Sequence, residues 1–174
     1  MKHTPLRALL AVTALIVGIG AVQAQESSNV VATEGDWTVF AADSPKECWA
    51  VSPPESVANT DSDGTPKEVA RGDIRLYVAY RPGQNGEVSF TGGYPFAPDS
   101  TVEVNVSGNK FNLFTEGESA WTGSPDEDAK LISALRAGSS AVVSARSARG
   151  TLTKDTFSLS GITAATNTAK SRCE

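Results

Sequence analysis

Only two cysteines occur in the sequence, Cys48 and Cys173, and the second lies one residue before the end of the chain. Two cysteines allow a single intramolecular disulfide, which would join positions 173 − 48 = 125 residues apart. Cross-linking a loop of this length stabilises a fold by roughly 4–5 kcal/mol in the chain-entropy model, because it restricts the unfolded chain. Chain ends normally fray, so a bond at Cys173 would hold the C-terminal segment against the strand near Cys48. The alternative, a redox-active or metal-bound thiol, is disfavoured because the sequence has no Cys-x-x-Cys motif.

The first 24 residues have the pattern of a secretory signal peptide. Lys2 and Arg7 form a positive n-region, an apolar stretch follows, and Val22-Gln23-Ala24 places small residues at the −3 and −1 positions of a cleavage site. The apolar stretch is too short for a spanning helix, which needs about 20 residues, and no later segment looks long and apolar enough to span a membrane. We expect residues 1–24 to be removed and residues 25–174 to form a single domain in a periplasmic or secreted protein. In such oxidising compartments a lone cysteine pair is typically a disulfide.

The charge of the mature chain limits its partners. Without Lys2 and Arg7, the 15 basic residues fall to 13 against 20 acidic residues, which gives a net charge near −7. An acidic surface repels phosphate backbones and anionic lipids. Nucleic acids and membrane surfaces are therefore disfavoured as partners, and no cofactor is expected.

Short segments of alternating polarity predict antiparallel strands. In DIRLYVAYR, at residues 73–81, side chains alternate between an apolar face and a face that carries Arg75, Tyr77 and Arg81. Further strands are expected at residues 37–40, 48–51, 87–91, 102–106, 110–114, 141–145 and 156–159. Residues 25–35 are expected to be a loose lead-in, and residues 53–72, which hold almost no large apolar residue, a long exposed loop.

Two helices complete the predicted fold. Ser124, Pro125 and Glu127 form a capping-box pattern that starts a helix, and Gly138 ends it. Ile162 and its helically spaced alanines indicate a second helix, which has poor helix formers and needs docking through Cys173. The predicted fold class is mainly β, an antiparallel sandwich or partly closed barrel with two packed helices.

The order of several segments resembles the invasion associated locus B family. The segments are RGDIRLYVAYRPG, GEVSFTGGYPF, FNLFTEGESAW, SARGTLTKDTFSLSGITAA and a terminal cysteine, and the match covers nearly the whole mature chain. The resemblance implies a secreted or periplasmic protein with a compact, mainly β fold. The family takes its name from a pathogen protein linked to entry into host cells, so a role in host association is implied by the name alone. The resemblance carries no catalytic motif onto this sequence.

The residues required by the common catalytic sites are absent. The only histidine, His3, leaves with the signal peptide, which removes Ser-His-Asp and Cys-His catalysis and all histidine-containing zinc sites. No nucleotide-binding motif occurs. Carboxylates remain as possible catalysts, and Glu116 and Glu118 beside Trp121 are the candidates for a hydrolase acting on a cell-wall or polysaccharide substrate. A solvated turn explains the same two glutamates.

Two short motifs invite functional interpretations that we do not adopt. Residues 59–64, NTDSDG, resemble the start of a calcium loop, but Ala70 stands where a bidentate glutamate is needed, so no metal site is predicted. Residues 71–73 spell the integrin-binding tripeptide Arg-Gly-Asp, which a turn before the next strand also explains.

The preferred candidate binding surface is the outer stripe of the strand at residues 73–81. Arg75 and Arg81 flank Tyr77, and two cations beside an aromatic ring could hold a carboxylate or an anionic sugar. The structural alternative is a stripe paired with cross-strand acids such as Glu87. The predicted function is a non-enzymatic envelope protein that binds a protein or cell-envelope component, and the alternative is the carboxylate-dependent hydrolase.

Overall fold

The computed structural model describes residues 29–174, and the predicted signal peptide at residues 1–24 lies outside the described residues. The described chain forms one 11-stranded antiparallel sheet and two helices. The strands are β1 (Val30–Glu34), β2 (Trp37–Asp43), β3 (Lys46–Ser52), β4 (Ser56–Thr60), β5 (Arg75–Tyr80), β6 (Glu87–Thr91), β7 (Thr101–Val106), β8 (Asn109–Glu116), β9 (Ser119–Trp121), β10 (Ser140–Arg146) and β11 (Leu152–Ser158). The helices are α1 (Pro125–Ala137) and α2 (Ile162–Cys173).

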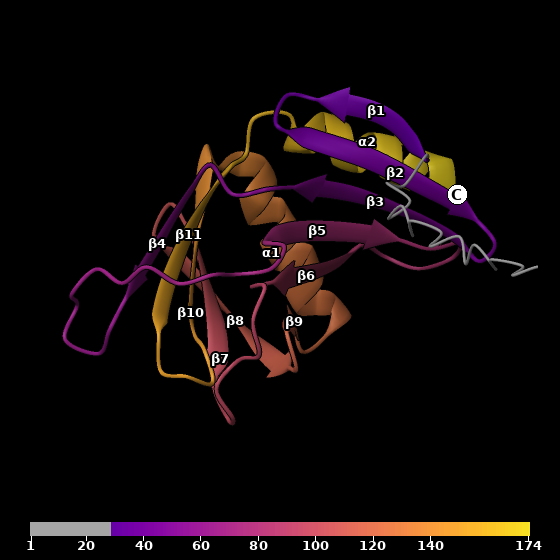
Figure 1. Ribbon diagram of the computed structural model, residues 1–174. Helices are drawn as coiled ribbons and strands as arrows, with labels where there is room; N and C mark the ends of the chain where they lie inside the picture. The colour runs from indigo at the N-terminus through magenta and orange to yellow at the C-terminus, as the bar shows by residue number, and fades with distance from the viewer. Residues whose placement is uncertain (1–28) are drawn as a thin grey trace, which may run out of the picture.

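The sheet is open and strongly bent. Its strand order is β1-β2-β3-β5-β6-β9-β8-β7-β10-β11-β4, so β1 and β4 are the edges. Figure 1 shows β1, β2, β3 and β5 running crosswise to β4, β11, β10 and β7. The bend brings strands that are distant in this order into contact: the ring centroids of Phe90 on β6 and Phe157 on β11 lie 6.1 Å apart, and Trp37 Nε1 on β2 donates a hydrogen bond to the carbonyl of Ser158. The predicted mainly β fold with two packed helices is confirmed.

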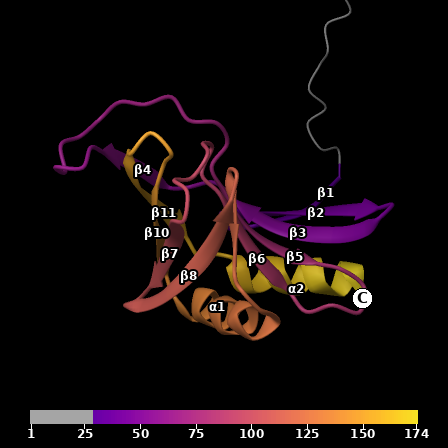
Figure 2. The ribbon, with the colours of Figure 1, turned by 90° about the horizontal axis from the view of Figure 1, so that it is seen from below.

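Alternating side chains fill the core from one face of the sheet. On β5, Leu76, Val78 and Tyr80 are buried, whereas Arg75 and Tyr77 on the opposite face are partly exposed. The helices cover the core side, with α2 packed mainly against β2 and β3 and α1 against β6 (Figure 2). Neither helix is long and apolar enough to cross a membrane.

Helix α1 begins with the predicted capping box. It also ends at the predicted Gly138, but close packing and not a left-handed backbone explains the glycine there. The Ser124 hydroxyl accepts a hydrogen bond from the backbone N–H of Glu127, whose own carboxylate accepts one from Gly123 N. Gly138 has a φ of −89°, so it is not a left-handed cap. A side chain there would instead come within 2.5 Å of Val106 Cγ1, so the glycine allows the helix end to pack closely on β7.

The C-terminal helix is docked as the cysteine pattern predicts. Cys48 on β3 and Cys173 on α2 have their Cα atoms 5.9 Å apart, which is disulfide distance, and their sulfur atoms are bonded. Ile162, Ala165 and Ala169 are buried on the same side of the helix. The last helix is therefore held both by apolar packing and by the bond to β3.

Two predicted loops contain strands. β1 lies within the expected lead-in at residues 25–35 and pairs with β2. β4 lies within the expected loop at residues 53–72 and pairs with β11 from Ser56 to Thr60. Both are edge strands with exposed side chains, including Val30 and Val57 at 51% exposure each. Such strands are held by backbone hydrogen bonds, so their sequences lack the apolar alternation by which the inner strands were predicted.

Candidate functional site

Arg75 and Tyr77 lie on the face of the sheet opposite the core, together with aromatic residues of two neighbouring strands. In the sheet register Tyr77 is the partner of Val51 on β3, and Trp49 on β3 is the partner of Phe40 on β2. Cross-strand partners project from the same face of a sheet. The structure therefore groups three aromatic rings and an arginine on β2, β3 and β5.

These residues surround a hollow of about 370 Å³. It is lined by Asn29, Phe40, Ala42, Trp49, Val51, Arg75 and Tyr77. We call Phe40, Trp49, Val51, Arg75 and Tyr77 the outer aromatic face. Its large side chains are all partly exposed, and apolar side chains that gather on one surface often mark a binding site, whereas single exposed ones do not.

The guanidinium of Arg75 is only loosely held. Its Nη1 donates to the backbone carbonyl of Ile74 at 2.9 Å, and its Nη2 lies 3.6 Å from Asp73 Oδ1. The Asp73 side chain is 85% exposed, and a surface pair of this kind contributes little. Arg75 can therefore exchange its contact with Asp73 for an anionic ligand at small cost.

The phenol of Tyr77 remains protonated over the physiological pH range. Burial raises the pKa of Tyr77 above its ordinary value near 10, and the charge of Arg75 opposes that rise. The hydroxyl can therefore act as a hydrogen-bond donor beside the guanidinium. An arginine and a neutral tyrosine on a flat aromatic surface suit a carboxylate or an anionic sugar.

Arg81, the third predicted binding residue, does not line this hollow. Its Nη2 lies 2.5 Å from Glu47 Oε1, and its Nη1 lies 3.4 Å from Glu87 Oε2. Glu87 is the acid that the structural alternative predicted as a cross-strand partner, and the pair is present. Arg81 is thus held between two carboxylates, and the predicted stripe divides into a loosely held part at Arg75 and Tyr77 and a firmly paired part at Arg81.

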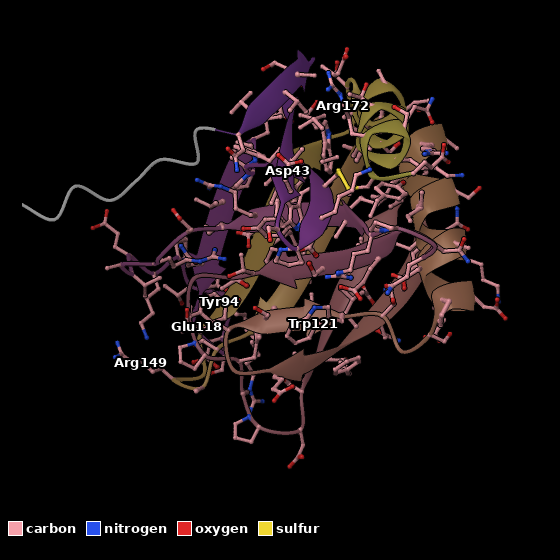
Figure 3. All side chains as sticks on the ribbon, turned by 90° about the vertical axis from the view of Figure 1, so that its right-hand side faces the viewer. Asp43, Tyr94, Glu118, Trp121, Arg149 and Arg172 are labelled. Atoms are coloured by element: carbon pink, nitrogen blue, oxygen red, sulfur yellow. A yellow bond between two sulfur atoms is a disulfide. The ribbon has the colours of Figure 1, made fainter. Side chains whose placement is uncertain are left out.

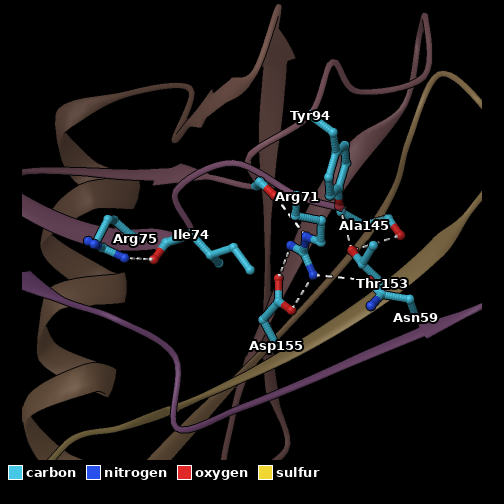
Figure 4. A network of polar contacts seen from close by, with 9 residues as sticks. Asn59, Arg71, Ile74, Arg75, Tyr94, Ala145, Thr153 and Asp155 are labelled. Carbon is cyan, nitrogen blue, oxygen red and sulfur yellow. Dashed lines mark hydrogen bonds and ion pairs between the residues drawn. The ribbon is translucent and has the colours of Figure 1, made fainter. Parts of the chain in front are cut away.

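The arginine of the Arg-Gly-Asp tripeptide is buried in the sheet. Arg71 forms a two-pronged ion pair with Asp155 on β11, with N···O distances of 2.7 and 2.6 Å, and its guanidinium lies 4.9 Å from the ring centre of Tyr94 (Figure 4). Burial raises the pKa of Asp155, and the hydrogen bonds and charge of Arg71 oppose that rise. Tyr94 also shares a hydrogen bond with Thr153. These contacts hold the segment before β5 against β11, so that Gly72 and Asp73 are exposed but the arginine of the tripeptide is not.

The two candidate catalytic glutamates line different hollows. Glu116 lines one beside Trp121, and Glu118 lines another of about 250 Å³ with Tyr94 and Arg149. Figure 3 shows Tyr94, Glu118 and Arg149 near one corner and Trp121 apart from them. Both glutamates are exposed. A glycosidase needs two carboxylates facing one bond of the substrate, and these two do not share a hollow.

The calcium-like segment uses its first aspartate to shape its own turn. Asp61 Oδ1 accepts hydrogen bonds from the backbone N–H groups of Asp63 and Thr65, both at 2.9 Å. Within residues 29–174, no group of three or more potential ligands could hold a metal ion.

Phe40, Trp49 and Val51 are the members of the outer aromatic face that were not predicted from the sequence to belong to a site. Both strands were predicted, and alternation within each strand shows that Phe40 and Trp49 point away from the buried Val39 and Cys48. The missing information was the register between strands, which decides which outward side chains become neighbours.

The fold places the protein in a class of disulfide-bonded, mainly β proteins whose single bent sheet is covered by two helices. A comparison with family models matches residues 37–170 to the invasion associated locus B protein family. Because this match covers more than half of the chain, the chain belongs to the invasion associated locus B family.

One solved structure extends the likeness to three dimensions. The crystal structure of invasion associated protein B from Bartonella henselae aligns with a TM-score of 0.55 at 16% identity, covering 79% of this chain and 94% of that one. At this identity the likeness concerns the fold alone. None of the curated proteins with which the chain was compared matches it.

Proposed function

We propose that this protein is exported to the periplasm or the cell exterior and acts there by binding a protein or cell-envelope component, without catalysis. The observation that carries the proposal is the outer aromatic face, where Phe40, Trp49 and Tyr77 surround a hollow beside the loosely held Arg75. Apolar side chains that gather in one patch on a protein surface often mark an interaction site. The disulfide between Cys48 and Cys173 supports export, because such bonds persist in oxidising compartments.

The chemistry of this face favours a ligand that is flat and anionic. Tryptophan and tyrosine rings contribute apolar contact area with little loss of side-chain freedom, and Arg75 can form paired hydrogen bonds with a carboxylate. A glycan that carries carboxylates, or an acidic protein segment, meets both requirements. Support for a binding role over the hydrolase also comes from Glu116 and Glu118, which line separate hollows.

The proposal is tested by photo-crosslinking in the envelope of the organism that makes the protein. Benzoylphenylalanine replaces Trp49, since it is also aromatic, and in a second protein it replaces Leu152, a partly exposed residue of β11. Position 49 should give a defined adduct that position 152 does not give. Arg75→Glu in the first protein should reduce that adduct about tenfold, because a charged hydrogen bond is replaced by repulsion.

The matched control is Arg146→Glu, which makes the same charge change at an exposed residue of β10. It should leave the adduct within about twofold. Arg81→Glu is unsuitable, because it would place a third carboxylate between Glu47 and Glu87 and perturb the fold. Equal losses for Arg75→Glu and Arg146→Glu would contradict the proposal, and so would turnover of a cell-wall substrate that Glu116→Gln or Glu118→Gln abolishes.

A further inference from the structure

A second pair of aromatic rings is exposed at the junction of β8, β9 and α1. Phe114 on β8 and Trp121 on β9 are register partners, and their ring centroids lie 5.7 Å apart with the planes tilted by 31°. Phe114 is 50% exposed, the highest value for any phenylalanine among the described residues. The pair borders a hollow of about 470 Å³ that lies at the end of β9, where the chain passes into α1.

The charged residues that line this hollow are all acidic. They are Glu87, Glu116 and Asp128, and no lysine or arginine lines it. Glu87 shares Arg81 with Glu47, whereas Glu116 and Asp128 form no salt bridge with any residue in the described part of the chain. The hollow therefore combines two ring faces with at least two uncompensated carboxylates.

Two of its polar side chains are buried without a full set of partners. Asp128 is 7% exposed, and the hydrogen bond that its carboxylate accepts from Val88 N at 2.7 Å is the only one its side chain makes within residues 29–174. Thr122 is 8% exposed, and its Oγ1 has no hydrogen-bond partner among the same residues. Buried polar groups normally find partners, so Asp128 and Thr122 leave hydrogen-bonding capacity unused beside the hollow.

The position of the hollow at the start of α1 weighs against a cation, because a helix N-terminus carries partial positive charge. Here, however, Ser124 and Glu127 already accept hydrogen bonds from the amides around that terminus. An ionised carboxylate carries a full charge, whereas a helix terminus contributes about half of one. The net field at the hollow therefore favours a cation.

We propose that this hollow binds an arginine side chain of a partner protein. A guanidinium stacks on aromatic rings and also forms paired hydrogen bonds with carboxylates, so it matches both components of the site. A metal ion fits less well, because no cluster of three potential ligands exists within the described residues. This site is distinct from the outer aromatic face in residues and in charge, so either can fail without the other.

The test uses the complete mature protein and a blocked peptide, acetyl-(Gly-Arg)3-amide. Binding is followed through the indole N–H signal of Trp121 in an NMR spectrum, which Trp121→Phe identifies. The arginine peptide should shift this signal in a saturable way, and 0.5 M salt should weaken the binding by screening. The same peptide with citrulline, which has the shape of arginine without its charge, should bind at least about tenfold more weakly.

Variants separate this site from general surface charge. Glu116→Gln should weaken the arginine peptide about five- to tenfold, and Phe114→Ala should do so without unfolding the protein, because half of that ring is already exposed. Glu118→Gln makes the same charge change two residues away in another hollow and should alter affinity by less than about twofold.

Four results would each overturn the proposal. They are equal weakening by Glu116→Gln and Glu118→Gln, equal binding of the citrulline peptide, a Trp121 shift caused by calcium or magnesium but not by the peptide, and no shift at millimolar peptide in a folded protein.

Discussion

At the scale of single residues, the buried pair of Arg71 and Asp155 gives the Arg-Gly-Asp tripeptide a structural role. The side chains of the pair are 5% and 0% exposed, and the two-pronged contact joins the segment before β5 to β11. A receptor that reads this tripeptide would need its arginine, which is unreachable here. The sequence could not reveal the pairing, because the two residues are 84 positions apart and no pattern links them.

Removal of one member of this pair should destabilise the protein strongly. Arg71→Ala leaves the Asp155 carboxylate buried without its partner, so we expect a loss of about 3–5 kcal/mol in the free energy of unfolding. Urea denaturation followed by circular dichroism measures this loss. Asp73→Ala, which truncates the exposed acid of the same tripeptide, should change stability by less than about 0.5 kcal/mol. Similar losses for the two variants would show that the pair contributes no more than an ordinary surface contact.

At the scale of elements, the longer strands with one buried face were predictable, whereas the edge strands β1 and β4 and the three-residue inner strand β9 were not. Leu76, Val78 and Tyr80 repeat every second residue because β5 has neighbours on both sides and a core beneath it. β4 has Val57 as its only large apolar residue, and that side chain is half exposed. Its place beside β11 is set by backbone hydrogen bonds, which any sequence can form.

Substitutions at Gly138, at the end of α1, test whether this position requires glycine for close packing or for a left-handed backbone conformation. Gly138→Ala should destabilise the protein by about 1–3 kcal/mol, because the new methyl group would overlap Val106 Cγ1 in a tightly packed core. Gly138→Asn should be worse still, although asparagine would be preferred to alanine at a left-handed cap. Thermal unfolding of the two variants ranks them.

A double variant shows whether the loss of stability in Gly138→Ala comes from the contact with Val106. Val106→Ala makes room beside Gly138, so the combination with Gly138→Ala should be less destabilising than the sum of the single changes. Additive losses would instead point to the backbone at Gly138.

At the scale of the whole molecule, the two candidate sites lie on one continuous face of the bent sheet. In the sheet register, Tyr77 on β5 is the partner of Ser89 on β6, and Ser89 is also the partner of Trp121 on β9. Trp121 is in turn the partner of Phe114 on β8. One outward row of side chains thus connects the hollow at Arg75 with the acidic hollow. The sequence indicated Arg75 and Tyr77, but the row exists only because strands far apart in the chain become neighbours, which local patterns do not encode.

The disulfide should stabilise one part of the molecule more than the other. Loss of the bond in Cys173→Ser should lower the free energy of unfolding by about 2–4 kcal/mol. Under native conditions the backbone amides of α2 should exchange hydrogen faster, while those of β7, β8 and β10 change little, because α2 packs mainly on β2 and β3. Hydrogen exchange read by mass spectrometry distinguishes the two groups.

The same samples test the bond itself. The wild-type protein should weigh two hydrogens less before reduction than after it. Two thiols that react with an alkylating agent without prior reduction, or uniform acceleration of exchange over the whole sheet, would contradict this account.

The contacts between the beginning and the end of the described chain also impose an order in time. Trp37 needs the carbonyl of Ser158, β4 needs β11, and Cys48 needs Cys173. A polypeptide is made from its N-terminus, so its first strands must wait, with these partners missing, until the last residues emerge. A chain that lacks only α2 would leave Cys48 unpaired and the core side of β2 and β3 uncovered, so it should unfold more readily than the complete chain. Completion of the fold therefore waits until the last residues have been made.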